Sequence, residues 1–120
     1  MSELDGTDQK LAYYPRLKRL HQYVEQSYSE PIPLEKAARI VALERSYFSS
    51  YFRAKVGITF TDWLRQVRVE KAMELMKAND FSISEVAVAV GFKELRTFER
   101  AFKRYALKTP REFKKSVLPG

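Results

Sequence analysis

The stretch EVAVAVGFKELRTFERAFKRY, residues 85–105, decides the fold of this chain. It begins as an apolar run rich in small residues, breaks at Gly91, and resumes as a segment studded with cations. Phe98, Phe102 and Tyr105 share one side of this second segment, because helical positions three or four residues apart lie on the same face. Its cations fall on the opposite side: Arg96, Arg100 and Lys103. The pattern predicts a short helix, a turn, and a longer helix anchored by one face only.

Apolar spacing and helix-capping residues predict helices along the rest of the chain as well. The expected helices occupy residues 15–28, 34–41, 45–56, 59–79, 82–90, 95–106 and 109–116. No useful length of the sequence alternates apolar and polar residues as a half-buried strand would. We therefore expect an all-α fold of about seven helices.

The chain contains an internal repeat. A shift of 49 or 50 residues superposes apolar and aromatic positions: Ala38 on Ala87, Val41 on Val90, Phe48 on Phe98, and Phe52 on Phe102. Each unit is a short helix, a tight turn and a longer helix with Phe at i and i+4. A small alanine in the first helix lets the second cross close to it, which is typical of a helix-turn-helix.

The repeat defines the expected domain organisation. Residues 1–14 form a flexible tail, 15–57 a first helix-turn-helix subdomain, 58–79 a linker helix, and 80–116 a second subdomain. A linker of this length would be roughly 30 Å long, and one turn of B-DNA is about 34 Å. Two units held so far apart could enter successive segments of the major groove.

The positive charge is concentrated near the C-terminus. The net charge is +7, and residues 93–115 alone carry nine cations and three anions. An uneven basic charge favours a polyanionic partner, with nucleic acid first and an anionic membrane second.

Several classes of protein are disfavoured by composition. There is no cysteine, and His21 is the only histidine, so no thiolate site and no histidine cluster can form. No phosphate-binding glycine loop or nucleophile–base set suggests catalysis. We expect no enzyme activity, no cofactor and no metal. The longest apolar run, at 86–90, is too short to span a membrane, and no signal peptide is visible.

Three motifs resemble the DNA-binding domain of the AraC/XylS family of bacterial transcription regulators. They are SYFSSYFRAKVGITFTDWLRQVRVEKAMELM (46–76), SISEVAVAVGFKE (82–94) and TFERAFKRYALKTPREFK (97–114). The resemblance covers about residues 15–116. It implies two helix-turn-helix units joined by a rigid helix, with recognition helices at about 45–56 and 95–106 in adjacent major-groove segments.

The resemblance and the helical geometry together nominate residues for DNA contact. The family's base-reading positions fall on Ser46, Ser49, Ser50, Leu95, Arg96, Glu99 and Arg100. The helical wheel selects the same residues except Leu95, which it places toward the core. Expected phosphate contacts are Arg45, Arg53, Lys93, Lys103 and Arg104, and Tyr47 is expected to flank the DNA backbone.

Alternatives remain open at single residues. Arg96 and Arg100 could bind guanine, or bind phosphates, or pair with Glu99, and Glu99 could accept a hydrogen bond from cytosine or merely orient the arginines. Glu44 stands where the family usually has a small cap, so the helix after it is expected to start less firmly.

The expected partners are double-stranded DNA and RNA polymerase, with no membrane. We expect the chain to be a monomer in the bacterial cytoplasm, associated with the nucleoid. It would act as a regulator, whether activator or repressor. The rival from another class is a basic helical adaptor that binds an acidic protein. Duplex binding whose logarithm falls with the logarithm of salt concentration would separate the two.

Overall fold

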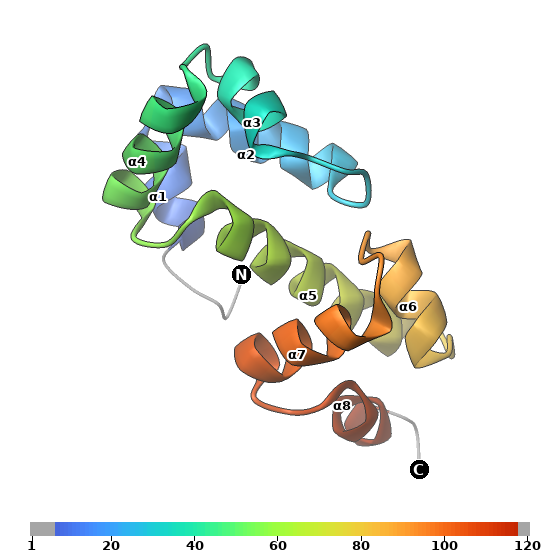
Figure 1. Cartoon of the computed structure of the whole chain (residues 1–120). Helices are drawn as coiled ribbons and strands as arrows, with labels where there is room; N and C mark the ends of the chain where they lie inside the picture. The colour runs from blue at the N-terminus through green and yellow to red at the C-terminus, as the bar shows by residue number, and fades with distance from the viewer. Residues whose placement is uncertain (1–6, 118–120) are drawn as a thin grey trace. The chain divides into compact units, whose positions relative to one another are not determined.

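The computed structural model describes residues 7–117, and every regular element in that range is an α-helix. The predicted all-α fold is confirmed, with one helix more than expected (Figure 1). The eight helices are α1 (Thr7–Tyr13), α2 (Pro15–Ser27), α3 (Leu34–Ile40), α4 (Arg45–Val56), α5 (Phe60–Ala78), α6 (Ile83–Ala89), α7 (Leu95–Ala106) and α8 (Pro110–Val117). The chain divides within α5 into two compact units, one ending at Leu64 and the other beginning at Arg65.

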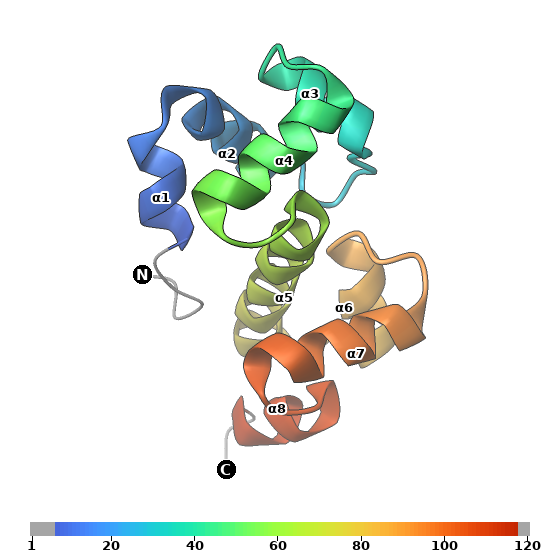
Figure 2. The ribbon, with the colours of Figure 1, turned by 60° about the vertical axis from the view of Figure 1, so that its left-hand side comes forward.

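The first unit packs α4 against α3 and α1, while α2 lies against both α1 and α3 (Figure 2). Its core contains a cluster of aromatic rings. Phe52 lies 5.7 Å from Phe60 and 5.8 Å from Trp63, measured between ring centroids, and Phe48 lies 5.7 Å from Phe60. These four side chains are almost completely buried. The start of α5 therefore closes the core on which α4 rests.

The flexible tail predicted for residues 1–14 is wrong over Thr7–Tyr13, which form α1. Residues 1–6 lie outside the described residues. An isolated helix of this length is unstable in water, so tertiary contacts must hold it. Leu11 is completely buried, and the Lys10 ammonium donates to the Val56 carbonyl oxygen at 3.4 Å. Among residues 10–13, Leu11 alone is buried, and a single buried position shows no periodicity, which is why the sequence pattern missed this helix.

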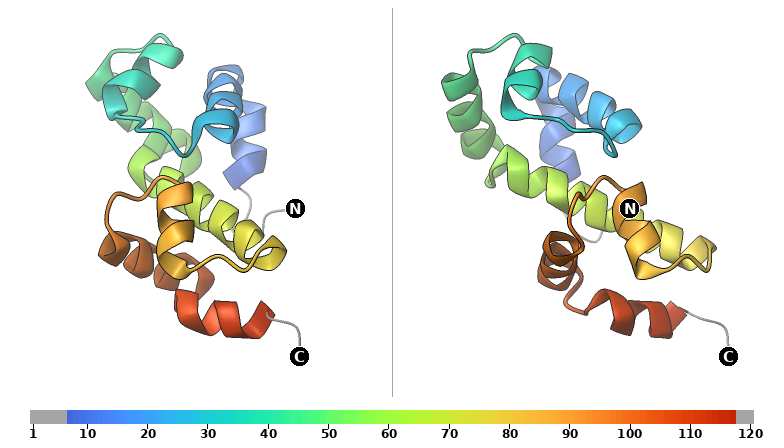
Figure 3. Two further views of the ribbon diagram at one scale, coloured as in Figure 1. Left: turned by 90° about the vertical axis from the view of Figure 1, so that its right-hand side faces the viewer. Right: turned by 45° about the vertical axis from the view of Figure 1, so that its right-hand side comes forward.

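The second unit packs α7 against both α6 and α8 (Figure 3). A chain of ring contacts runs through it, with centroid distances of 5.3 Å from Phe92 to Phe98, 5.6 Å from Phe98 to Phe102, and 5.6 Å from Phe102 to Phe113. Phe98 and Phe102 are completely buried. The phenylalanine side of the helix is thus the anchored side, as the spacing predicts.

The turn inside each helix-turn-helix has the same backbone geometry in both units. The Leu43 N–H donates to the Ala38 carbonyl at 2.9 Å, and the Phe92 N–H donates to the Ala87 carbonyl at 3.0 Å. Both turns pass through the left-handed region, at Ala42 (φ 58°) and Gly91 (φ 102°). The two units that are related by a shift of 49 residues therefore share this turn hydrogen bond as well as their sequence pattern.

Side-chain caps begin three of the helices as predicted. Thr59 Oγ1 accepts the Asp62 N–H at 3.1 Å at the start of α5. Ser82 and Glu85 form a reciprocal capping box at α6. Thr109 and Glu112 do the same at α8, with bonds of 2.8 and 3.0 Å. These caps satisfy backbone N–H groups that the first helical turn leaves without partners.

Candidate nucleic-acid interface

Helix α4 has one buried side and one solvent-facing side. Phe48, Phe52 and Val56 face the core of the first unit. The predicted base-contact residues Ser46, Ser49 and Ser50 are all exposed. The hydroxyls of Ser49 and Ser50 can therefore donate to and accept from an incoming ligand, whereas the Ser46 hydroxyl already hydrogen-bonds to the Glu44 carboxylate.

The start of α4 is well fixed, contrary to the sequence-based expectation. The Glu44 carboxylate accepts the N–H groups of Ser46 and Tyr47, each at 3.0 Å. These backbone hydrogen bonds hold the pKa of Glu44 below its ordinary value of 4.5. A glutamate side chain is long enough to reach back to the first turn, so it caps the helix where the family usually has a small residue. The ordered N-terminus holds Ser46 and Tyr47 in place.

The far end of α4 is fixed by a different device. Gly57 follows the helix with φ of 99° and donates its N–H to the Arg53 carbonyl. Lys10 from α1 donates to the Val56 carbonyl at the same end. A cation near the last carbonyls of a helix is favourable, because those groups carry partial negative charge. Both ends of the candidate recognition helix are therefore stabilised within the first unit.

Helix α7 presents the second set of predicted residues. Phe98, Ala101 and Phe102 are buried, whereas Arg96, Glu99 and Arg100 are exposed. The three exposed residues occupy one side of the helix at i, i+3 and i+4. Arg96 and Glu99 are spaced by three residues, so pairing between them and contact of either with a ligand both stay open.

The helical wheel placed Leu95 toward the core, and the structure contradicts this placement. Its side chain is 42% exposed. Leu95 is the first residue of α7, so it has no preceding turn of its own helix to pack against. Glu94 before it makes no side-chain cap to the backbone and instead accepts a hydrogen bond from Thr97 Oγ1 at 3.3 Å. The family-derived assignment and the structure therefore agree that Leu95 is available on the surface.

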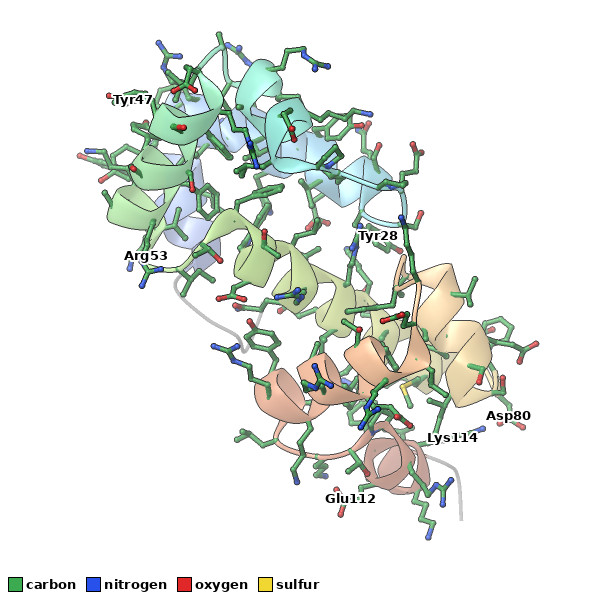
Figure 4. The ribbon with its side chains drawn as sticks, viewed as in Figure 1. Tyr28, Tyr47, Arg53, Asp80, Glu112 and Lys114 are labelled. Atoms are coloured by element: carbon green, nitrogen blue, oxygen red, sulfur yellow. The ribbon has the colours of Figure 1, made fainter. Side chains whose placement is uncertain are left out.

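The predicted phosphate-contact residues are also exposed in the structure: Arg45, Arg53, Lys93, Lys103 and Arg104. Figure 4 shows Arg53, like Tyr47, pointing away from the ribbon of α4. The Arg104 guanidinium lies 5.4 Å from the centre of the Tyr105 ring, which is within the range of a cation–π interaction. Exposed cations of this kind are suited to phosphates, which need charge but little orientation.

Sequence reasoning missed an aromatic contact network beside the serines. The Lys55 ammonium lies 5.3 Å from the Tyr14 ring and 5.8 Å from the Tyr51 ring, and Tyr51 lies 6.2 Å from Tyr47. Tyr14 connects α1 to α2, so no local pattern places it near α4. The spacing of Tyr47, Tyr51 and Lys55 at i, i+4 and i+8 was the one available signal.

No group of three or more possible metal ligands forms among residues 7–117. Within the same range, no helix is both long enough and apolar enough to cross a membrane.

Comparison with known proteins identifies the family. A family model described as a helix-turn-helix domain matches residues 37–116, about two thirds of the chain. The chain belongs to the AraC-type helix-turn-helix domains. The phenylalanine-anchored helices of both units, α4 and α7, lie inside the matched range, whereas α1 and α2 precede it.

Relatives and solved structures agree with this assignment. The chain is 28% identical over 106 residues to the Msm operon regulatory protein of Streptococcus mutans, covering 88% of this chain and 37% of that protein. The C-terminal domain of AraT, a response regulator from Geobacillus stearothermophilus, is 28% identical with a TM-score of 0.80, and 89% of each chain is covered. The DNA-binding domain of AdpA, a global transcriptional factor solved with a target DNA, is 25% identical with a TM-score of 0.75, covering 85% of this chain and 91% of that one.

The chain spans only about a third of the length of the first curated relatives, with shares of 37%, 34% and 41%. These relatives are named as regulatory proteins. The matched relatives are thus named as regulators and not as enzymes, and this chain carries the AraC-type helix-turn-helix domain.

Proposed function

We propose that this chain binds specific sites in double-stranded DNA through α4 and α7, which enter adjacent segments of the major groove, and so regulates bacterial transcription. The observation that carries the proposal is the repeated geometry of the two units. Each anchors a helix by paired phenylalanines and leaves the opposite side exposed. The second unit adds a cluster of cations on that side. A relative with the same fold, AdpA, was solved with its target DNA.

Roles follow from the chemistry of the exposed side chains. Arg96 and Arg100 can each make two parallel hydrogen bonds to guanine, the commonest specific contact in the major groove. Ser46, Ser49 and Ser50 can pair with several bases, directly or through water, so the first unit should discriminate less sharply. Leu95 offers an apolar contact for a thymine methyl group, and Glu99 an acceptor for a cytosine amino group.

The five cations Arg45, Arg53, Lys93, Lys103 and Arg104 position the protein on the phosphates. RNA polymerase as a second partner, a monomeric state, and a place on the nucleoid in the cytoplasm belong to the same proposal. The rival function, an adaptor for an acidic protein, rests on the same cations. It leaves the matched turns and the two exposed helix faces without a role.

The experiment measures binding of fluorescent duplexes by anisotropy over a series of salt concentrations. The duplexes are one selected from a random pool and one of random sequence. The logarithm of the association constant should fall linearly with the logarithm of salt, with a slope of about 0.9 per phosphate contact. Absence of any such slope on either duplex would leave the adaptor as the better account.

Two matched variants separate base contact from phosphate contact in the second unit. Arg96→Ala should cost about 1–3 kcal/mol on the selected duplex and relax the preference at one base pair. Lys103→Ala should weaken both duplexes alike and reduce the salt slope by about one contact. Equal losses on both duplexes for Arg96→Ala would show that Arg96 does not read a base.

A further inference from the structure

We propose that Tyr47 donates its phenolic hydroxyl to a phosphate oxygen beside the groove entered by α4, and that Tyr51 holds its ring in place. This deepens the proposed function and rests on it. It adds an uncharged contact with the DNA backbone to the cationic contacts that we propose for Arg45 and Arg53 in the same unit.

The position of Tyr47 suits this role. It is the third residue of α4, and at about 100° per residue it lies about 60° around the helix from Ser50. Its side chain is 59% exposed, although a tyrosine ring is large and partly apolar. Figure 4 shows it pointing outward from the start of α4. A group at the edge of a groove-facing side meets the sugar-phosphate backbone that lines the groove.

A contact network orders the Tyr47 ring before any ligand arrives. The rings of Tyr47 and Tyr51 are inclined by 32° at 6.2 Å, and the Lys55 ammonium lies between Tyr51 and Tyr14. Tyr14 in turn meets Tyr13 edge to face at 5.0 Å. Restricting the ring in the free protein lowers the conformational entropy lost on binding, which improves the affinity of a single hydrogen bond.

The second unit has no equivalent of this network. The shift of 50 residues places Thr97 at the position of Tyr47, and its hydroxyl already donates to Glu94. Ala101, which is buried, stands at the position of Tyr51. There the outward side carries Arg96 and Arg100 instead. The first unit, with serines at the base-contact positions, has Tyr47. The second unit, with arginines at two of those positions, has no tyrosine at the corresponding place.

The phosphate contact predicts a specific response to salt. A tyrosine side chain carries no positive charge, so a phosphate contact that it makes releases no counterion. Tyr47→Phe removes the hydroxyl alone and should weaken binding about tenfold on both the selected and the random duplex, with an unchanged salt slope. Arg53→Ala should instead reduce the slope by about 0.9.

The matched control is Tyr51→Phe, which removes the same hydroxyl one turn away and keeps the ring contact. It should bind like the wild type, whereas Tyr51→Ala should lose affinity because the Tyr47 ring is no longer held. Tyr47→Ala should lose no less than Tyr47→Phe. Circular dichroism and thermal unfolding should be unchanged for Tyr47→Phe, since the side chain is mostly solvent-exposed.

Three outcomes would overturn the proposal. Wild-type affinity for Tyr47→Phe would show that the hydroxyl makes no contact. Loss confined to the selected duplex would indicate contact with a base. Equal loss for Tyr51→Phe would show that the effect does not belong to Tyr47. The wild-type salt series tests the proposed function separately. If the wild type binds no duplex, both proposals fail. If the wild type binds and Tyr47→Phe binds with the same affinity, only the proposal for Tyr47 fails.

Discussion

Replacing Gly57 by alanine should destabilise the first unit by about 1 kcal/mol. Gly57 ends α4 with φ of 99°, in the left-handed region. An L-residue there brings its Cβ close to a carbonyl oxygen, which costs about 1–2 kcal/mol. Alanine also restricts the unfolded chain relative to glycine, which offsets about 0.4–1 kcal/mol of that cost. The difference between the two effects is the expected loss.

The surroundings of Gly57 add little to this value. A Cβ built on Gly57 would meet only the Lys10 ammonium, at 3.8 Å, which is an ordinary contact. The effect therefore comes from the backbone, and a reciprocal variant can check it. Ala42 is an exposed alanine with φ of 58° in the same unit. Ala42→Gly should relieve strain of the same kind and stabilise the unit by about 0.5 kcal/mol after the entropy of glycine is subtracted.

Urea unfolding followed by tryptophan fluorescence measures both variants. Trp63 is the only tryptophan, is 1% exposed, and packs against Phe52 in the first unit, so its emission reports on that unit. Gly57→Ala should lower the urea midpoint by about 0.5 M with an unchanged slope, and Ala42→Gly should raise it slightly. An unchanged midpoint for Gly57→Ala would refute the argument, because it would mean that the left-handed backbone imposes no cost there.

Two further predictions concern stability. Backbone hydrogen bonds hold the pKa of three capping glutamates below the ordinary value of 4.5: Glu44, Glu85 and Glu112. A folded-state pKa below the unfolded one stabilises the protein above pH 4.5, and this stabilisation is lost as the pH falls through the folded values. The urea concentration at the unfolding midpoint should therefore decrease as the pH is lowered below 4.5. A variant with glutamine at all three positions should show a smaller decrease, and a pH profile identical to that of the wild type would contradict the assignment. Leu11→Ala should reduce the unfolding free energy of the first unit by about 2–5 kcal/mol, as judged by Trp63 fluorescence, because Leu11 is fully buried. The exposed control Ala12→Ser should leave it unchanged, and similar losses for both would show that α1 does not pack as described.

Much of the fold was predictable because its determinants are local. The capping box of Thr109 and Glu112 spans four residues, and the structure forms both of its hydrogen bonds. Phe48 and Phe52 are spaced by one helical turn and are both buried. Gly57 ends α4 as expected of a left-handed residue. In each case the interacting groups lie within a few positions of each other in sequence, so periodicity and propensity suffice.

The unpredicted features depend on contacts that are distant in sequence. Helix α1 exists because Leu11 is buried and Lys10 reaches the end of α4, 46 residues away. The network from Tyr14 through Lys55 to Tyr51 joins segments that no local pattern relates. The cap by Glu44 is local, yet it depends on a side-chain conformation that residue type alone does not reveal. The roles of the exposed residues on α4 and α7 stay predictions, since exposure shows that a side chain is available and does not show what it binds.

The left-handed positions show that the shared backbone of the two units does not depend on glycine at a fixed place. Each unit has one left-handed residue in its turn and one after its second helix. In each unit only one of these two residues is glycine, and the glycine stands at a different one of the two places in each unit. The first unit has Ala42 in the turn and Gly57 after the helix, and the second has Gly91 in the turn and Leu107 after the helix. A non-glycine residue adopts this conformation only where the surrounding contacts require it.

The exposed positions behave in the opposite way. Ser46 and Ser50 in the first unit correspond to Arg96 and Arg100 in the second, and neither pair touches the core. The repeated backbone therefore constrains the buried phenylalanines and the turns, while it leaves the outward side free to differ. That division explains how one helix-turn-helix scaffold, used twice in a single chain, can present serines at two exposed positions in one copy and arginines at the same positions in the other.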